Sequence, residues 1–130
     1  QLRAKVRFLS RFHDLYLEPR VRALFAHIKA AGRNQAEVAA QRAEITRRIG
    51  QLAQWSQPQP FLLTPQISRA DCGPLVTLPL AQQLLAACGQ PLELPARLQT
   101  WLDGASRHPA VERALSPWRV ATRAWLNPET

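Results

Sequence analysis

Residues 60–71 read Pro-Phe-Leu-Leu-Thr-Pro-Gln-Ile-Ser-Arg-Ala-Asp and are the most informative part of this chain. A loop of apolar residues runs directly into Ser68-x-x-Asp71, which has the spacing of a helix capping box. Ser68 can accept a hydrogen bond from the amide of Asp71, while the Asp71 carboxylate reaches back to the Ser68 amide and complements the helix dipole. The pattern predicts a helix that opens at Ser68.

The residues after this box are almost wholly apolar, and the next charged residue is Glu93. We therefore expect a central helix that is buried on all sides, runs to about Ala87 and is stopped by Gly89. Two prolines, Pro74 and Pro79, lie inside the predicted helix. Because proline removes a backbone hydrogen bond, we expect a bend near each.

The N-terminal segment places apolar residues at alternating steps of four and three, which predicts one long amphipathic helix from Leu2 to Ile28. Pro19 lies inside this segment and should kink the helix. Asn34 is a suitable N-cap for a second helix. The inward face of that helix is predicted to hold Val38, Ile45, Ile49 and Leu52.

The C-terminal third contains three more helix starts. Pro95 should open a short helix, and Pro109 and Pro117 should each begin another, with Ser116 capping the last. No stretch alternates apolar and polar residues over the length of a strand. With 130 residues and 46% hydrophobic content, the chain is expected to form one all-α domain, a bundle of about five to six helices around the central one.

These motifs together resemble the C-terminal, all-helical domain of cytosolic glutathione S-transferases. In that family a Pro-aromatic-aliphatic loop and a Ser/Thr-x-x-Asp box start the central buried helix. Residues 10–19 are similar to the family's first helix in this domain, and residues 98–111 to its closing segment, so the resemblance covers essentially the whole chain. Thr64 stands where the family usually has glycine, so here Pro65 must help to make the turn.

The resemblance implies that residues 1–130 are half of an enzyme. An N-terminal thioredoxin-like domain would supply most of the glutathione site and the thiol-activating residue, so no catalytic residue is assigned to this chain. A sequence that begins at Gln1 and contains no methionine fits a fragment of a longer protein. The family also implies a hydrophobic electrophile as substrate, a homodimer through the first two helices, and a cytoplasmic location. A non-catalytic protein-interaction module of the same fold is the alternative.

Site residues are assigned by the resemblance to the first predicted helix. Asp14 and Arg11 would bind glutathione, because a carboxylate facing the γ-glutamyl ammonium makes a charge-assisted hydrogen bond. The electrophile site would be lined by His13, Leu17, Arg20, Val21 and Leu24. Trp118 and Trp125 could close the same pocket.

Each of these assignments has a structural alternative. Asp14 could be a helix-surface residue paired with Arg11 or with a neighbour of Glu18. Leu17, Val21 and Leu24 could pack in the core, and the tryptophans could be packing anchors.

The chain is strongly basic, with 17 Lys and Arg against 9 Asp and Glu and a net charge of +8. A helical nucleic-acid binder could have this composition. However, the basic residues are spread over every predicted helix and aromatic residues are not interleaved with them. We interpret the charge as a solvated surface and expect no nucleic-acid partner.

The remaining reactive side chains suggest no second site. Cys72 and Cys88 lie in one predicted helix, roughly 24 Å apart, so they cannot pair, and two free thiols fit a reducing compartment. No His or Cys has metal-ligand spacing, so no metal is expected. The longest apolar stretch is too kinked and polar for a membrane span. Three histidines are scattered without evident partners, namely His13, His27 and His108.

Overall fold

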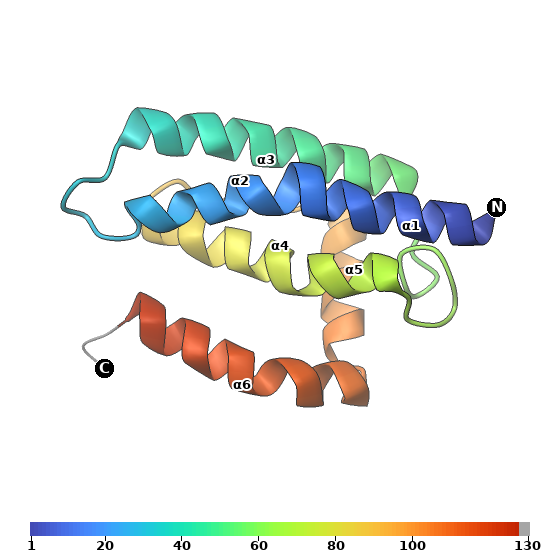
Figure 1. Ribbon diagram of the computed structural model, residues 1–130. Coiled ribbons are helices and arrows are strands. Elements are labelled where there is room, and N and C mark those ends of the chain that lie inside the picture. Colours follow the sequence, from blue (N-terminus) through green and yellow to red (C-terminus); the bar gives the residue numbers. More distant parts are fainter. Residues whose placement is uncertain (128–130) are drawn as a thin grey trace.

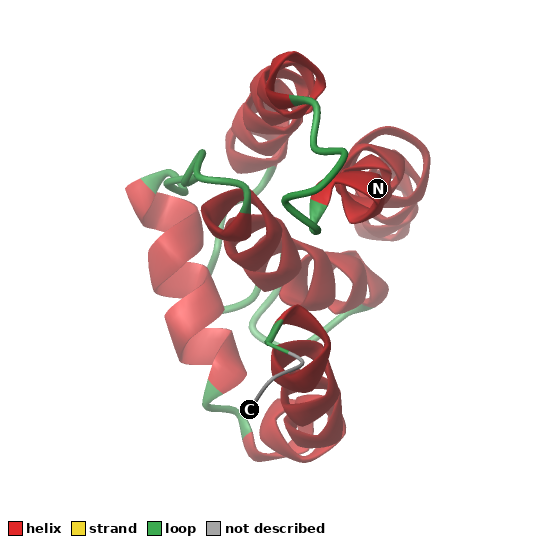
Figure 2. Cartoon of the chain, turned by 90° about the vertical axis from the view of Figure 1, so that its left-hand side faces the viewer, coloured by secondary structure: helices red, strands yellow, loops and turns green. Residues whose placement is uncertain are grey.

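The computed structural model describes residues 1–127, and these residues form helices joined by loops, with no strand among them (Figures 1 and 2). The all-α prediction is therefore confirmed. The helical elements are α1 (Leu2–Phe12), a π-helical turn η1 (His13–Leu17), α2 (Glu18–Arg22), a 3₁₀ turn η2 (Ala23–His27), α3 (Gln35–Trp55), α4 (Arg69–Ala87), α5 (Ala96–Ser106) and α6 (Pro109–Leu126).

Helix α4 occupies the centre of the arrangement. The continuous helical segment from α1 to η2 lies along one side of α4, and α3 packs on that segment (Figure 1). Helix α6 lies on the opposite side of α4. Helix α5 crosses the others and contacts both α4 and α6. The core lies where these helices meet, and its fully buried large side chains include Leu9, Leu17, Leu24, Ile45, Ile49, Leu52, Leu62, Leu78, Leu84, Leu85 and Leu98.

The capping box at the start of α4 is confirmed. The Ser68 N–H donates to Asp71 Oδ2 at 3.0 Å, and Ser68 Oγ accepts from the Ala70 N–H at 3.2 Å. Asp71 also accepts hydrogen bonds at Oδ1 from the Leu62 N–H at 2.9 Å and from Trp101 Nε1–H at 3.0 Å. One buried carboxylate thus joins the loop before α4, the start of α4 and the middle of α5.

The prediction that α4 is buried on all sides is wrong. Cys72, Gln83, Ala86 and Ala87 are exposed on it, because they line two hollows that remain open between α4 and α6. The predicted end of the helix is confirmed, since Gly89 follows it with a φ of +76°. This left-handed conformation is one that glycine adopts without steric cost.

The first predicted helix is helical from Leu2 to His27, but its hydrogen-bond pattern changes along its length. In η1 the Glu18 N–H donates to the His13 carbonyl five residues back. Pro19 follows directly and has no N–H to donate, so the wider turn lies immediately before the residue expected to disturb the helix. Leu17 of η1 is fully buried, whereas the neighbouring Tyr16 is 49% exposed.

Two further predictions concern α3 and α6. Asn34 caps α3 by accepting from the Glu37 N–H at 3.1 Å, and all four predicted inward residues of α3 are buried, as expected. The prediction of two short C-terminal helices is wrong, since α6 continues through Pro117 and Ser116 does not cap a helix. An ion pair between Glu112 and Arg119 spans the proline along this continuous helix.

Candidate functional site

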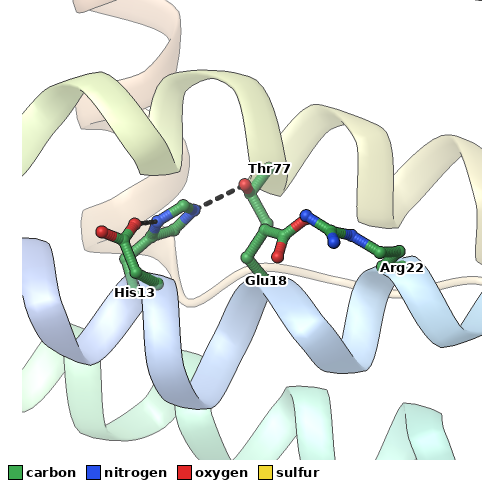
Figure 3. Close-up of polar contacts among 5 residues, drawn as sticks. His13, Glu18, Arg22 and Thr77 are labelled. Atoms are coloured by element: carbon green, nitrogen blue, oxygen red, sulfur yellow. Dashed lines mark hydrogen bonds and ion pairs between the residues drawn. The ribbon is translucent and has the colours of Figure 1, made fainter.

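The polar residues of the first helix gather at η1, where it faces α4. The wide turn directs His13 into the interface, where its side chain is only 8% exposed, while the neighbouring Asp14 stays at the surface with 57% of its side chain exposed. Thr77 of α4 lies opposite His13 and is 4% exposed (Figure 3). The site therefore combines one surface carboxylate with two buried polar groups from segments far apart in sequence.

A chain of two hydrogen bonds links these three residues. His13 Nδ1 lies 2.8 Å from Asp14 Oδ1, and His13 Nε2 lies 2.6 Å from Thr77 Oγ1 (Figure 3). Because a carboxylate only accepts, Nδ1 carries a proton, and in the neutral imidazole Nε2 accepts from the Thr77 hydroxyl. The imidazole holds the Asp14 carboxylate in one orientation, and Asp14 Oδ2 is left for another donor.

Gly73 makes the close approach of His13 to α4 possible. A Cβ built at Gly73 would lie 2.4 Å from His13 Nδ1 and 2.5 Å from His13 Cε1, well inside van der Waals contact. Any larger residue at this position would therefore displace the imidazole. In the sequence, the sign of this requirement is a glycine inside an apolar helix. Such a glycine can indicate that a side chain from elsewhere packs against the helix at that position.

The surface residues around Asp14 do not pair with it. Arg11 is exposed and forms no ion pair with Asp14, so the predicted alternative of an Asp14–Arg11 pair is wrong. Arg20 is exposed, and Glu18 pairs with Arg22 at 2.7 Å (Figure 3). Among residues 1–127, Asp14 thus has a single ion-pair partner, the buried His13.

The apolar residues assigned to the electrophile site lie beneath this surface. Leu17 and Leu24 are 0% exposed and Val21 is 1% exposed, so all three pack in the core of the described residues. This is the structural alternative that the sequence also allowed.

The C-terminal tryptophans lie away from η1. Trp125 packs edge-to-face on Phe25 of η2 with a centroid separation of 5.1 Å, and Trp118 lines a hollow of about 500 Å³ between α4 and α6. Trp125 therefore packs beside the η2 end of the segment assigned to the electrophile, and the hollow at Trp118 includes none of the residues assigned to that site.

The sequence suggested that the three histidines have no evident partners, and this is wrong. Besides His13, His27 is 6% exposed, accepts from the Asn34 N–H at Nδ1 and lies 3.4 Å from Glu37 through Nε2. His108 caps α6 by accepting from the Ala110 N–H at 3.2 Å. Sequence reasoning missed most of these partners because Thr77 lies on another helix, while Asn34 and Glu37 follow the end of the first one.

The cysteines and possible metal ligands add no second centre. Cys72 and Cys88 are both free, as their separation on one helix predicted, but Cys72 is exposed rather than buried. No group of three or more His, Cys, Asp or Glu in residues 1–127 is arranged to hold a metal ion. Over the same residues, every helix is too short or too polar to serve as a membrane span.

Exposed aromatic side chains form a patch on α1, η1 and the end of α3. This aromatic patch comprises Phe8, Tyr16 and Trp55, which are 49%, 49% and 39% exposed. Trp55 contacts Phe8 edge-to-face at 4.9 Å, and the Arg48 guanidinium lies 4.9 Å from the centroid of the Tyr16 ring. Basic and aromatic side chains are therefore adjacent here, although the linear sequence showed no such interleaving.

Comparison with known proteins gave no relative for this chain: no family model matches it, and no curated protein matches it.

Proposed function

We propose that this chain is the C-terminal substrate-binding domain of a glutathione S-transferase that conjugates the glutathione thiolate to hydrophobic electrophiles. The observation that carries the proposal is the capping box, in which the fully buried Asp71 ties the preceding loop and Trp101 to the start of a central helix. The all-α architecture with α4 at its centre supports the same proposal. Fold alone does not fix activity, so the proposal also depends on the polar site at η1.

In this proposal Asp14 binds the γ-glutamyl ammonium of glutathione. Its carboxylate is at the surface, and His13 holds Oδ1, so Oδ2 can accept a charge-assisted hydrogen bond from an ammonium. His13 and Thr77 act as positioning residues, because both are buried and reach the ligand only through Asp14. A thioredoxin-like partner domain would activate the thiol, and this domain would orient the two substrates.

Fewer residues of this chain can contact the electrophile than the resemblance implied. Leu17, Val21 and Leu24 support the surface from below and present no side-chain area to a ligand. Arg20 is exposed and would favour electrophiles that carry a negative charge. The alternative is a non-catalytic interaction module of the same fold, which the exposed aromatic patch favours.

The location and oligomeric state belong to the same proposal. Two free cysteines fit a reducing compartment such as the cytoplasm. A homodimer through α1 and α3 is supported by the aromatic patch, which lies on these helices. A third candidate function is nucleic-acid binding, which the contact between Arg48 and Tyr16 supports. A steep loss of affinity for nucleic acid with added salt would identify this function.

The test measures glutathione conjugation to 1-chloro-2,4-dinitrobenzene by the full-length natural protein. We expect turnover, and we expect Asp14→Asn to raise the KM for glutathione about tenfold without changing the melting temperature, because one charge-assisted hydrogen bond is lost. The matched control is Asp103→Asn, an exposed aspartate on α5. Equal KM in both variants would remove Asp14 from the site. A folded protein without turnover would favour the interaction module.

A further inference from the structure

A small hollow between α1 and the start of α4 is surrounded by arginines. It has a volume of about 190 Å³ and is lined by Val6, Arg7, Ser10, Arg11 and Arg69. Arg7, Ser10 and Arg11 share one face of α1 because residues three and four apart are neighbours on a helix. Arg69 is the first residue of α4, which packs against α1. Two helices therefore bring three guanidinium groups around one cavity.

These three arginines have no partner within the described residues. Arg7, Arg11 and Arg69 are exposed and take part in none of the ion pairs or side-chain hydrogen bonds of residues 1–127, and α1 contains no acidic residue. Seven of the other arginines find partners, whereas Arg3 and Arg113, among others, are also unpaired within residues 1–127 but lie outside the hollow. Those that bond to carboxylates or to backbone carbonyls are Arg22, Arg33, Arg42, Arg47, Arg48, Arg97 and Arg119.

The carboxylates nearest in sequence are already engaged. Asp14 is bonded to His13, and Asp71 is fully buried and accepts from Leu62, Ser68 and Trp101. The hollow thus collects three positive charges that repel one another. An anion bound among them would remove this repulsion.

We propose that this hollow binds the phosphate group of a soluble phosphomonoester. Such a group carries about two negative charges at pH 7 and three strong acceptor oxygens, which matches three guanidinium groups with Ser10 as a further donor. The hollow is smaller than the roughly 300–1,000 Å³ of pockets that enclose whole ligands. It takes the phosphate and leaves the remainder of the molecule in solvent. The site uses neither Asp14 nor the aromatic patch, but it shares Arg11 with the glutathione site that the resemblance implied.

The experiment titrates the chain with inorganic phosphate and then with glycerol 3-phosphate, and follows the backbone amide signals by NMR. Sodium chloride at matched ionic strength separates specific binding from general screening. We expect saturable shifts confined to the amides around Ser10 and Arg69, with glycerol 3-phosphate binding at least as tightly as phosphate. Glutathione, which has carboxylates but no phosphate, is expected not to compete.

Single substitutions locate the site. Arg7→Gln and Arg69→Gln should each weaken phosphate binding by about tenfold or more, because each removes a charge-assisted hydrogen bond. The matched controls are Arg3→Gln on the same helix and Arg113→Gln on α6, both exposed and outside the hollow, and their affinity should stay within about twofold of the unsubstituted chain. All four side chains are exposed, and equal melting temperatures will confirm that the variants fold.

Three results would overturn the proposal. Equal weakening by Arg3→Gln and Arg69→Gln would mean diffuse attraction to a basic surface. Displacement of phosphate by glutathione would assign the hollow to a carboxylate ligand. Binding to phosphatidylcholine vesicles that contain phosphatidic acid, without binding to glycerol 3-phosphate, would assign the same chemistry to a lipid headgroup.

Discussion

Asp71 receives hydrogen bonds from three separate parts of the chain, and this gives it a larger role than its capping-box partner. Its carboxylate is fully buried and accepts from the amides of Leu62 and Ser68 and from the Trp101 indole. The hydrogen bonds of Ser68 Oγ, by contrast, stay within the first turn of α4, where it accepts from the Ala70 N–H and donates to Asp71 Oδ2. The sequence predicted similar importance for both residues, and the tertiary contacts make them unequal.

We predict that Asp71→Ala lowers the free energy of unfolding by about 3 kcal/mol or more, because it leaves buried donors without an acceptor. Ser68→Ala should cost only about 1 kcal/mol, the usual loss of an N-cap. Urea denaturation of both variants measures the difference. Equal losses would show that Asp71 acts through the capping box alone.

Gly73 limits what can pack between α1 and α4. We predict that Gly73→Ala lowers the free energy of unfolding by about 1–3 kcal/mol, since the new Cβ would overlap the His13 ring and break its bond to Thr77. Gly50→Ala on α3 is the matched control, because nothing lies within 4 Å of its built Cβ and alanine favours the helix by up to about 1 kcal/mol. Thermal unfolding distinguishes the two, and a stabilising Gly73→Ala would contradict the close approach.

At the level of elements, tertiary packing in α6 overrides the local preference of proline for the start of a helix. Proline is common at the first position of a helix, and this preference led to the prediction of a break at Ser116. The structure instead keeps one helix, with Val111 buried before the proline and Thr122 buried after it. Burial on both sides of Pro117 favours a single continuous helix over two separate ones.

Substitutions at these two positions test the continuity of α6. Pro117→Ala should raise the free energy of unfolding by about 1–3 kcal/mol, because it restores a backbone donor inside a helix. Ser116→Ala should change it by no more than about 0.5 kcal/mol, since Ser116 is an exposed residue that caps nothing. A loss near 1 kcal/mol for Ser116→Ala in a denaturant titration would instead indicate a second helix that starts there.

Helix α3 carries the chain's clearest electrostatic cluster. Glu44 accepts from Arg47 and Arg48, and the hydrogen bond from Arg47 is the largest cause of the lowered pKa of the Glu44 carboxyl. Because the folded-state pKa is below the unfolded one, the contribution to stability is present above the ordinary carboxyl pKa and is lost as pH falls through the folded value.

We therefore predict that the stability difference between the unsubstituted chain and Glu44→Gln shrinks as the pH is lowered into the acidic range. NMR titration of the Glu44 side chain should give a lower midpoint in the unsubstituted chain than in Arg47→Gln. An unchanged midpoint in Arg47→Gln would show that this arginine does not hold the carboxylate.

At the scale of the whole molecule, the exposed aromatic patch is the surface best suited to self-association. Phe8 and Tyr16 expose about half of their area, and both contact the Phe12 ring, which also contacts Trp55. Large exposed apolar patches mark interaction sites in soluble proteins. The proposed homodimer would bury this surface between α1 and α3 of two copies. The basic residues of α1 would then lie near the edge of the contact.

We predict that the chain dimerises and that Phe8→Asp weakens the dimer by about tenfold or more, because a charge would be buried at the interface. Val120→Asp is the matched control, as Val120 is 63% exposed on α6, away from the patch. Sedimentation equilibrium measures both dissociation constants. A monomeric unsubstituted chain, or equal effects of the two variants, would contradict this interface.

The sequence by itself determined the features that depend on neighbouring residues. The capping box at Ser68, the Asn34 cap and the inward face of α3 all arise from spacing within one segment, so local patterns predict them. The all-α class follows from the same patterns, because helical periodicity is repeated along the chain.

Only the tertiary structure decided which polar groups meet across helices. His13 reaches Thr77 over 64 positions, and Asp71 reaches Trp101 over 30, and neither contact has a signal within its own segment. The arrangement of Arg7 and Arg11 with Arg69 likewise depends on how α1 packs on α4. Side chains distant in sequence are brought together by burial of the apolar faces, and that packing fixes both the η1 site and the arginine hollow.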